Sequence, residues 1–163
     1  MENTPSTAEY GIDIANMIAS CVNKGFVSGP FSEPPLNKFR ANSLMAVKQS
    51  TKVRPILNIS LPENCSFNDT VDEYELEKVK MCSAKSFSHT VLAAGKGAKM
   101  YKTDVRDAYK LVPARIKDLK LQGFCFIEKH FCETRIAFEG KPSVSIYDIV
   151  RNTIFTLAKL NVT

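Results

Sequence analysis

Two aspartates and a tyrosine stand close together in the segment Lys102-Thr103-Asp104-Val105-Arg106-Asp107-Ala108-Tyr109. On one turn of helix, the three-residue spacing of Asp104 and Asp107 would leave both acids beside the Tyr109 ring. Mg²⁺ prefers carboxylate oxygens, so Asp104 is the first candidate for a metal ligand. A two-metal phosphoryl-transfer site needs ions about 3.5–4 Å apart and therefore further acids. The alternative interpretation is that Asp104 caps a short helix, which is a frequent use of aspartate.

Basic residues gather in two stretches that flank an acidic one. The formal net charge is +5, from 22 basic and 17 acidic residues. Residues 36–54 hold five bases and no acid, residues 63–77 hold six acids and no base, and residues 96–120 hold eight bases around three aspartates. Two such basic stretches can line a phosphate-binding groove, and a solvated surface of mixed charge is the alternative.

Length and composition favour one domain with a real core, because the 163 residues are 44% hydrophobic. The five cysteines form no C-x-x-C pair, and His89 and His130 complete no zinc spacing, so reduced thiols are expected. No apolar run reaches the roughly 18 residues needed to cross a bilayer, and the N-terminus carries no signal segment. We therefore expect a soluble, intracellular protein of the cytoplasm or nucleus, without a membrane partner.

The first half of the chain predicts a helix, a connector and a hairpin. Apolar residues recur at helical spacing from Ile14 to Val22, and Gly25 is the expected stop. Three prolines make 29–35 a connector rather than a helix. Strands are expected over 43–47 and 53–59, and the polar residues 48–52 suit a positively charged hairpin tip. Residues 61–70 are expected to form a loop, and the acidic stretch after them is expected to be exposed.

The second half predicts alternating helices and strands. The expected elements are a helix over Ala84–Ala94 with Phe87, Val91 and Leu92 facing inward, a strand over Lys99–Asp104, a short helix over Ile116–Leu121, a strand pair carrying Phe124, Phe126, Phe131 and Ile136 with its turn near 128–130, and a helix over Val144–Leu160. The last helix places Ile146, Ile149, Val150, Ile154 and Leu157 on one face.

Four motifs follow one another along the chain: Gly29-Pro30-Phe31-Ser32-Glu33-Pro34-Pro35, Lys52-Val53-Arg54-Pro55-Ile56-Leu57, Ser66-Phe67-Asn68-Asp69, and Asp104-Val105-Arg106-Asp107-Ala108-Tyr109 with Pro113 beyond it. In this order and at these intervals they resemble the reverse transcriptase domain of retrotransposons, most of all the tyrosine-recombinase (DIRS-like) group, over about residues 25–160. The resemblance implies part of an α+β right-hand polymerase fold. It divides the chain into an N-terminal helix (1–24), a fingers-like segment (25–98) and a partial palm (99–163) that includes part of the fingers at 114–135.

The resemblance also implies roles for the Asp104 segment. Asp104 would be the catalytic metal ligand, joined by the backbone carbonyl of Val105, with Mg²⁺ as the ion and Mn²⁺ as its substitute. The backbone of Asp107 and Ala108 would face the incoming nucleotide. Tyr109 would be the gate whose ring collides with a ribose 2′-hydroxyl, whereas ordinary core packing is the alternative for such a tyrosine.

Two further regions receive roles in the same way. Arg54 and Lys52 would lie on the fingers hairpin and grip the triphosphate, and the alternative for both is a solvated hairpin charge. Residues 136–143 stand where the family has a Leu-Pro-Phe-Gly loop, and Gly140 would belong to the nucleotide site. Ala137 replaces the usual proline, and Glu139 replaces the first glycine, where its charge would repel nucleic acid unless it turns outward.

The reaction implied for a complete enzyme is RNA-directed DNA polymerisation, which adds deoxynucleoside triphosphates to a primer on an RNA or DNA template. Because the chain stops at Thr163 before any Tyr-x-Asp-Asp strand pair, we expect it to be inactive alone. Two other hypotheses are a domesticated remnant that binds RNA or an RNA–DNA hybrid without catalysis, and a folded remnant without function. An incomplete palm would leave the face from Ile146 to Leu157 uncovered, which predicts self-association.

Overall fold

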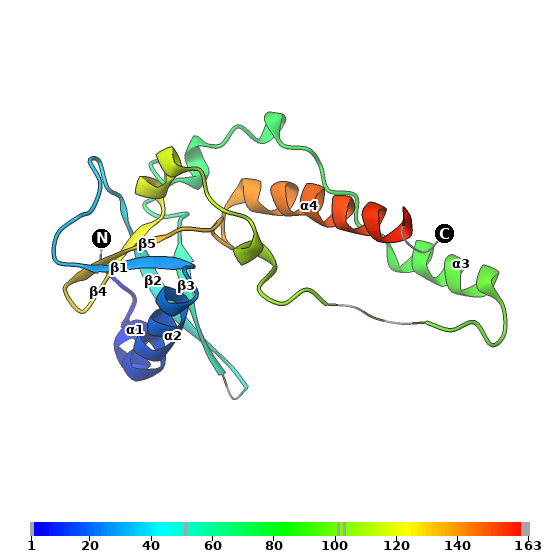
Figure 1. The fold of residues 1–163 in the computed structure, drawn as a ribbon, viewed down its shortest axis with the longest axis horizontal. Coiled ribbons are helices and arrows are strands. Elements are labelled where there is room, and N and C mark those ends of the chain that lie inside the picture. The colour runs from blue at the N-terminus through cyan, green and yellow to red at the C-terminus, as the bar shows by residue number, and fades with distance from the viewer. Residues whose placement is uncertain (1, 51, 101, 103, 161–163) are drawn as a thin grey trace.

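Five strands form one mixed sheet, whose order is β1-β5-β4-β2-β3 (Figure 1). A computed structural model describes residues 2–50, 52–100, 102 and 104–160 of the chain, with residues 158–160 described by their backbone alone. The strands are β1 (Val27–Phe31), β2 (Ala41–Gln49), β3 (Lys52–Asn58), β4 (Gly123–Phe126) and β5 (Lys129–Glu133). Neighbours are antiparallel except β2 and β4, which are parallel.

The predicted hairpin is confirmed as β2 and β3. The two strands pair from Ser43 opposite Asn58 to Gln49 opposite Lys52. Inward residues such as Leu44, Ala46 and Leu57 are buried, whereas the strand ends near the turn are exposed. The polar tip was predicted over 48–52, but residues 48 and 49 belong to β2 and residue 52 to β3, and residue 51 lies outside the described residues.

The edge strand β1 corrects the prediction for residues 29–35. Their prolines predicted a connector, yet residues 29–31 continue β1 beside β5, and only the residues after Phe31 are irregular. An edge strand tolerates Pro30 because its outer backbone groups need no partner, and the register shifts here, between Ser28 and Phe31. Gly29 has a φ of +129°, and a Cβ there would lie 2.8 Å from the His130 carbonyl oxygen. Glycine therefore permits the close approach of β5.

Two N-terminal helices, α1 (Pro5–Glu9) and α2 (Gly11–Asn23), pack against the sheet. The predicted helix over 14–22 is confirmed, and the chain leaves it at Gly25 with a φ of +69°. Ile14 and Ile18 are 0% and 7% exposed, and they share one buried cluster with apolar side chains of all five strands, namely Val27, Leu44, Leu57, Phe124 and Phe131. This cluster is the core of the protein.

The strand pair β4–β5 is also confirmed, but its turn lies at Ile127 and Glu128, earlier than the predicted 128–130, because residues 129 and 130 already belong to β5. Phe124 and Phe131 stack with their ring centroids 5.3 Å apart. Ile136 was predicted on the second strand but lies three residues beyond its end, where its N–H donates to the Val112 carbonyl. The helix predicted over Ile116–Leu121 is present as a 3₁₀ helix with those bounds.

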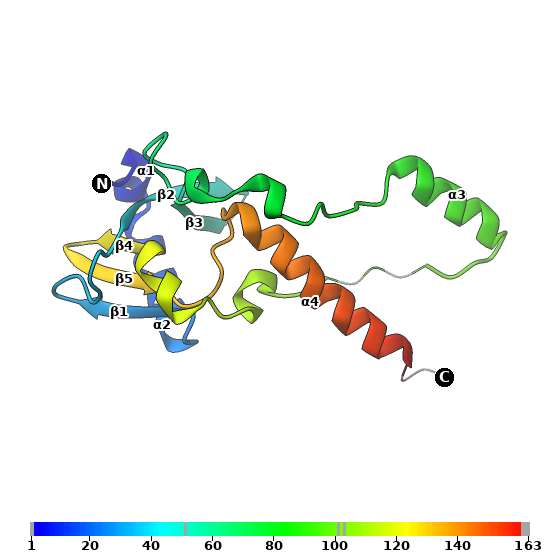
Figure 2. The same ribbon diagram turned by 90° about the horizontal axis from the view of Figure 1, so that it is seen from above.

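Helix α3 (Ala84–Ala94) has the predicted bounds but not the predicted environment. Phe87 and Leu92 were expected to face inward, yet they are 58% and 79% exposed, and no residue of α3 is buried. Figures 1 and 2 show why, because α3 lies far from the sheet at the end of a long excursion. We call residues 78–106 the arm. An amphipathic pattern predicts a helix but buries nothing without a surface to pack on.

Among the described residues, the strand predicted over Lys99–Asp104 is wrong. Residues 101 and 103 lie outside the described residues, and the described residues 99, 100, 102 and 104 belong to no strand. None of the five strands pairs with the described residues of this stretch, and an extended segment gains its hydrogen bonds only from a neighbour.

The long helix α4 (Lys141–Leu160) confirms the last predicted helix and begins three residues earlier than expected. It runs away from the sheet, as Figure 2 shows. Ile149, Ile154 and Leu157 are 56%, 50% and 55% exposed, so the predicted apolar face is largely open to solvent. None of the helices among the described residues is both long and apolar enough to cross a membrane.

Candidate functional site

The Asp104 segment is an irregular approach to a short 3₁₀ helix over Ala108–Leu111. Asp104 and Val105 are exposed and precede this helix, so the two acids do not share one helical turn beside Tyr109, as the spacing had suggested. Asp104 does not cap the helix either. Asp107 occupies the cap position in a left-handed conformation, with φ of 53° and ψ of 37° and no side-chain capping bond.

Two ion pairs link the segment to other elements, one to the end of α2 and one to the sheet. Asp107 lies 3.8 Å from the Lys24 ammonium at the end of α2, and both side chains are well exposed, so this pair contributes little. Lys110 forms an ion pair and hydrogen bond with Glu133 on β5, and these side chains are only 22% and 15% exposed. Burial raises the pKa of Glu133, and the neighbouring Lys110 ammonium opposes that shift.

Tyr109 packs into a cluster of three rings. Its ring meets Phe138 edge to face at a centroid distance of 5.2 Å and lies 5.4 Å from the ring of Tyr147 on α4. Such aromatic pairs add about 0.5–1.5 kcal/mol beyond the area they bury. Tyr109 and the loop that holds Gly140, two of the predicted site regions, are thus in direct contact through Phe138.

Residues 137–143, which comprise a short loop and the first residues of α4 and are called the loop 137–143 below, are tightly closed on themselves. The Ser143 hydroxyl donates to the Ala137 carbonyl at 2.6 Å, and the Gly140 N–H donates to the same carbonyl at 3.1 Å. Gly140 is buried, and a Cβ there would lie 2.6 Å from the Ser143 hydroxyl, so a larger residue would force the loop open.

The two departures from the expected loop sequence are both accommodated. Ala137 donates its N–H to the Gln122 side-chain oxygen at 2.8 Å, a bond that proline has no proton to make. Glu139 is exposed, so its carboxylate turns outward. Neither substitution disrupts the loop.

The Ser66–Asp69 motif supplies a contact that the sequence reasoning missed. Asp69 accepts hydrogen bonds from the backbone N–H and the hydroxyl of Ser66, and these bonds lower its pKa. Asn68 is 5% exposed and reaches across to the loop, where its amide bonds the backbone of Glu139 and Lys141. The motif had marked this region by its resemblance, but no spacing rule connects residue 68 with residues 139–141.

Arg54 and Lys52 lie on β3 close to the hairpin turn, and both are exposed. No ion pair or hydrogen bond links either of them to the Asp104–Tyr109 segment within the described part of the chain. The structure therefore brings Tyr109 and the Gly140 loop together, but it leaves Asp104 and the hairpin cations apart from them.

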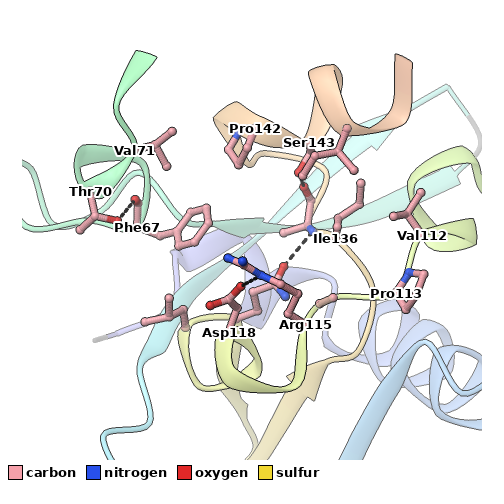
Figure 3. A pocket seen from close by; sticks show the side chains of 15 residues that line it. Phe67, Thr70, Val71, Val112, Pro113, Arg115, Asp118, Ile136, Pro142 and Ser143 are labelled. Carbon is pink, nitrogen blue, oxygen red and sulfur yellow. Dashed lines mark hydrogen bonds and ion pairs between the residues drawn. The ribbon is translucent and has the colours of Figure 1, made fainter. Parts of the chain in front are cut away.

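A cavity of about 660 Å³ opens between the Ser66–Asp69 region, residues 112–122 and the start of α4 (Figure 3). Its walls are mainly apolar, with Phe67, Val112, Ile136 and Ile146 among them. Arg115 and Asp118 form an ion pair of 2.7 Å at its edge. The sequence reasoning did not anticipate this cavity, because its lining comes from four separate segments.

The described residues contain no cluster of three or more histidine, cysteine, aspartate or glutamate side chains that could hold a metal ion. Asp104 is nevertheless free to bind, because its carboxylate is exposed and takes part in no ion pair within the described residues. One carboxylate and one backbone carbonyl give a partial set of hard oxygen ligands of the kind that Mg²⁺ accepts.

Comparison with known proteins gave structural similarity alone. Two crystal structures of the protease-reverse transcriptase of prototype foamy virus are similar to this chain, a selenomethionine-labelled CSH mutant with a TM-score of 0.63 and the native protein with 0.61. Both are 15% identical in sequence and match 93% of this chain, which spans 18% of their length. No family model matches, and no curated protein matches. The chain thus has part of a reverse transcriptase-like fold.

Proposed function

We propose that this chain is the fingers and the first half of the palm of a retrotransposon reverse transcriptase, of the tyrosine-recombinase (DIRS-like) group. The fold similarity over 93% of the chain supports the general assignment. The order of the four motifs supports the narrower one. The division into an N-terminal helix (1–24), fingers (25–98) and partial palm (99–163) belongs to the same proposal.

The contact between Tyr109 and Phe138 carries this proposal. In it, Tyr109 limits the space at the sugar, and the backbone of Asp107, Ala108 and Gly140 lines the nucleotide. Phe138 and Tyr147 contact the Tyr109 ring at centroid distances of 5.2 and 5.4 Å, and these contacts would restrict its movement, as a steric gate requires.

The remaining roles concern charge. Asp104, with the Val105 carbonyl, would hold Mg²⁺ or Mn²⁺, which neutralises the triphosphate of the incoming deoxynucleotide. Arg54 and Lys52 would hold the same triphosphate from the hairpin. The sequence contains no Tyr-x-Asp-Asp, so the further carboxylates of a two-metal site are not among its 163 residues. Polymerisation on a primed RNA or DNA template is accordingly proposed for a complete enzyme and not for this chain alone.

A second candidate function is binding of RNA or an RNA–DNA hybrid without catalysis. It is favoured by the exposed cations of the hairpin, Lys52 and Arg54, which can contact phosphates. In this form the basic surface contacts phosphates and Asp104 has no role.

Binding of a fluorescein-labelled RNA–DNA hybrid to the full chain, followed by anisotropy across a salt series, tests both candidates. We expect log K to fall linearly with log salt, and Lys52→Ala with Arg54→Ala to reduce the slope by about 2, roughly one for each lost phosphate contact. The matched control is Lys78→Ala with Lys80→Ala, which removes the same charge from exposed positions in the arm. Equal slopes for the two double variants would contradict the role of the hairpin.

Binding of a fluorescent deoxynucleoside triphosphate separates the two candidates. The polymerase assignment predicts Mg²⁺-dependent binding that Asp104→Asn abolishes, because the amide lacks the anionic oxygen. The binding-remnant assignment predicts no Mg²⁺ dependence and no effect of that substitution. Asp72→Asn, at an exposed acid outside the proposed site, controls for the change in charge.

Self-association through the exposed face of α4 is also part of the proposal. Ile149 and Ile154 would be covered by a second copy. Sedimentation velocity should show reversible dimers that Ile149→Asp with Ile154→Asp dissociates, and a monomer at all concentrations would contradict it.

A further inference from the structure

Asn68 links Ser60, eight residues before it, with Glu139 and Lys141, which lie 71 and 73 residues after it. Its side-chain nitrogen donates to the Ser60 hydroxyl at 2.7 Å and to the Glu139 carbonyl at 2.9 Å, while its side-chain oxygen accepts from the Lys141 N–H at 2.9 Å. Ser60 follows the end of β3, so one amide connects the fingers-like hairpin with the start of α4.

The Asn68 side chain supplies a hydrogen-bond partner to the Lys141 N–H, which has none within its own helix. The first amides of a helix lack partners within it, and Lys141 is the first residue of α4. Pro142, which follows, has no N–H to offer. Because Asn68 is 5% exposed, its own amide is held from water and depends on these three bonds for partners.

The position of Asn68 is itself fixed. Asp69 accepts from the Ser66 hydroxyl at 2.7 Å and from the Ser66 N–H at 2.8 Å, and the Ser66 hydroxyl also lies 3.1 Å from the Asp69 N–H. The Asn68 N–H donates to the carbonyl of Ile59, which is fully buried. The turn is thereby anchored to the core before its side chain reaches the loop.

We infer that Asn68 is a positioning residue, which sets the loop 137–143 and thereby holds Phe138 against Tyr109. Two steps carry the effect. Asn68 bonds the backbone on both sides of Gly140, and Phe138 lies one residue before the Glu139 carbonyl that Asn68 binds. Phe138 then meets the Tyr109 ring at 5.2 Å. The inference deepens the proposed function, on which its meaning for nucleotide binding rests, but the contact itself does not depend on that function.

The test places a fluorine label on tyrosine and follows Tyr109 by ¹⁹F NMR. The full chain is produced with 3-fluorotyrosine, and the Tyr109 signal is assigned by its loss in Tyr109→Phe. In Asn68→Ala we expect the Tyr109 signal to move towards that of a solvent-exposed tyrosine, and hydrogen exchange at the Lys141 amide to accelerate about tenfold. The Tyr10 signal, which reports on the core beside α2, should stay in place.

Asn3→Ala is the matched control. Asn3 is also a bridging amide, since it donates to the Cys125 carbonyl at 2.8 Å and accepts from the Leu44 N–H at 2.9 Å, but it bridges at the sheet instead of at the loop. This variant loses a comparable set of bonds and should leave the Tyr109 signal unchanged. If both variants move the signal equally, Asn68 acts only through general stability and the inference is overturned.

Asn68→Asp adds a graded variant that stays informative if Asn68→Ala fails to fold. Aspartate keeps an acceptor for the Lys141 N–H but cannot donate to the Glu139 carbonyl, so an intermediate shift of the Tyr109 signal is expected. An unchanged Tyr109 signal in a folded Asn68 variant overturns the inference.

Hybrid binding by the same variants separates the inference from the proposed function. Weaker binding in Asn68→Ala, together with a moved Tyr109 signal, supports both. A moved signal in a chain whose wild type binds neither hybrid nor triphosphate supports the positioning role and counts against the proposed function.

Discussion

The helices α2 and α3 carry similar sequence patterns but have opposite environments. Both have apolar residues at helical spacing, and both form helices close to the predicted bounds. Ile14 of α2 is fully buried in the core against the sheet, whereas Leu92 of α3 is 79% exposed. The difference teaches that periodicity determines which residues become a helix, while burial depends on whether the rest of the chain offers a surface. The sheet offers one to α2, and the arm carries α3 away from it (Figure 2).

The largest difference between the two helices should appear in stability. Ile14→Ala removes a fully buried side chain and should lower the free energy of unfolding by about 2–5 kcal/mol. Phe87→Ala on α3 should change it by less than about 0.5 kcal/mol, because the ring is already exposed. Urea denaturation of the two variants measures both effects. A loss of more than about 1 kcal/mol in Phe87→Ala would be typical of a buried side chain, and it would mean that α3 packs against the sheet or its helices in solution.

The rate of cysteine alkylation should also differ between the sheet and the arm. Cys132 on β5 is buried, its sulfur lies 2.9 Å from the Leu119 carbonyl oxygen, and burial raises its pKa from 9.0 to about 11. Iodoacetamide should therefore alkylate Cys132 about a hundredfold more slowly than the exposed Cys82 of the arm. Peptide mass spectrometry over time gives the two rates. Equal rates would show that β5 opens readily.

Substitution of two glycines, one in the sheet and one in the arm, should lower the free energy of unfolding by different amounts, with the larger loss about 1–3 kcal/mol. A Cβ at Gly123 would lie 2.7 Å from the Arg40 carbonyl oxygen, so Gly123→Ala should force β4 away from β2 and lower stability by that amount. Gly97 in the arm has open space around it but a φ of +86°, so Gly97→Ala should reduce stability by no more than about 1 kcal/mol. Thermal denaturation measures both losses of stability. A larger loss in Gly97→Ala than in Gly123→Ala would contradict the distinction between the packed sheet and the exposed arm.

The smallest expected effect is a pH dependence at Glu133. Burial raises its pKa above the ordinary 4.5 although Lys110 opposes the shift, so the folded protein binds this proton more tightly than the unfolded chain does. The resulting stabilisation is complete below about pH 4.5 and is lost as the pH rises through the raised pKa. The stability of the wild type relative to Glu133→Gln should therefore fall between pH 4 and pH 7. Urea denaturation of the two proteins across that range measures the change, and exposed Glu77→Gln should show no such trend.

Local patterns predicted most of the fold, because they depend on neighbours in sequence. The spacing of Ile14 and Ile18 predicted α2, and the alternation of Phe124 and Phe126 predicted β4. The pattern failed at Pro30, whose missing N–H is harmless only at a sheet edge, and at residues 99, 100, 102 and 104, which belong to no strand. Whether a segment becomes an edge strand or finds a neighbour to pair with depends on the arrangement of the whole sheet, which a local pattern does not contain.

The candidate site could be predicted only in pieces. Resemblance pointed to Tyr109 and Gly140, but nothing in the sequence indicated that Phe138 would link them. The bridge made by Asn68 was equally hidden, because a buried amide and an exposed one look the same in a sequence. The roles of Asp104, Arg54 and Lys52 stay predictions.

The parallel pairing of β2 with β4, from Ala41 opposite Gly123, closes a loop that contains the whole arm. Loop-closure entropy grows only slowly, by about 0.6 kcal/mol for each doubling of length, so this insertion between β3 and β4 is easily tolerated. The insertion has a larger consequence for the time at which the strands can pair during synthesis. Val27 pairs with Glu133, so β1 leaves the ribosome long before its partner exists. During translation its edge is unpaired while the arm is made, and this interval is when a nascent chain would most need a chaperone.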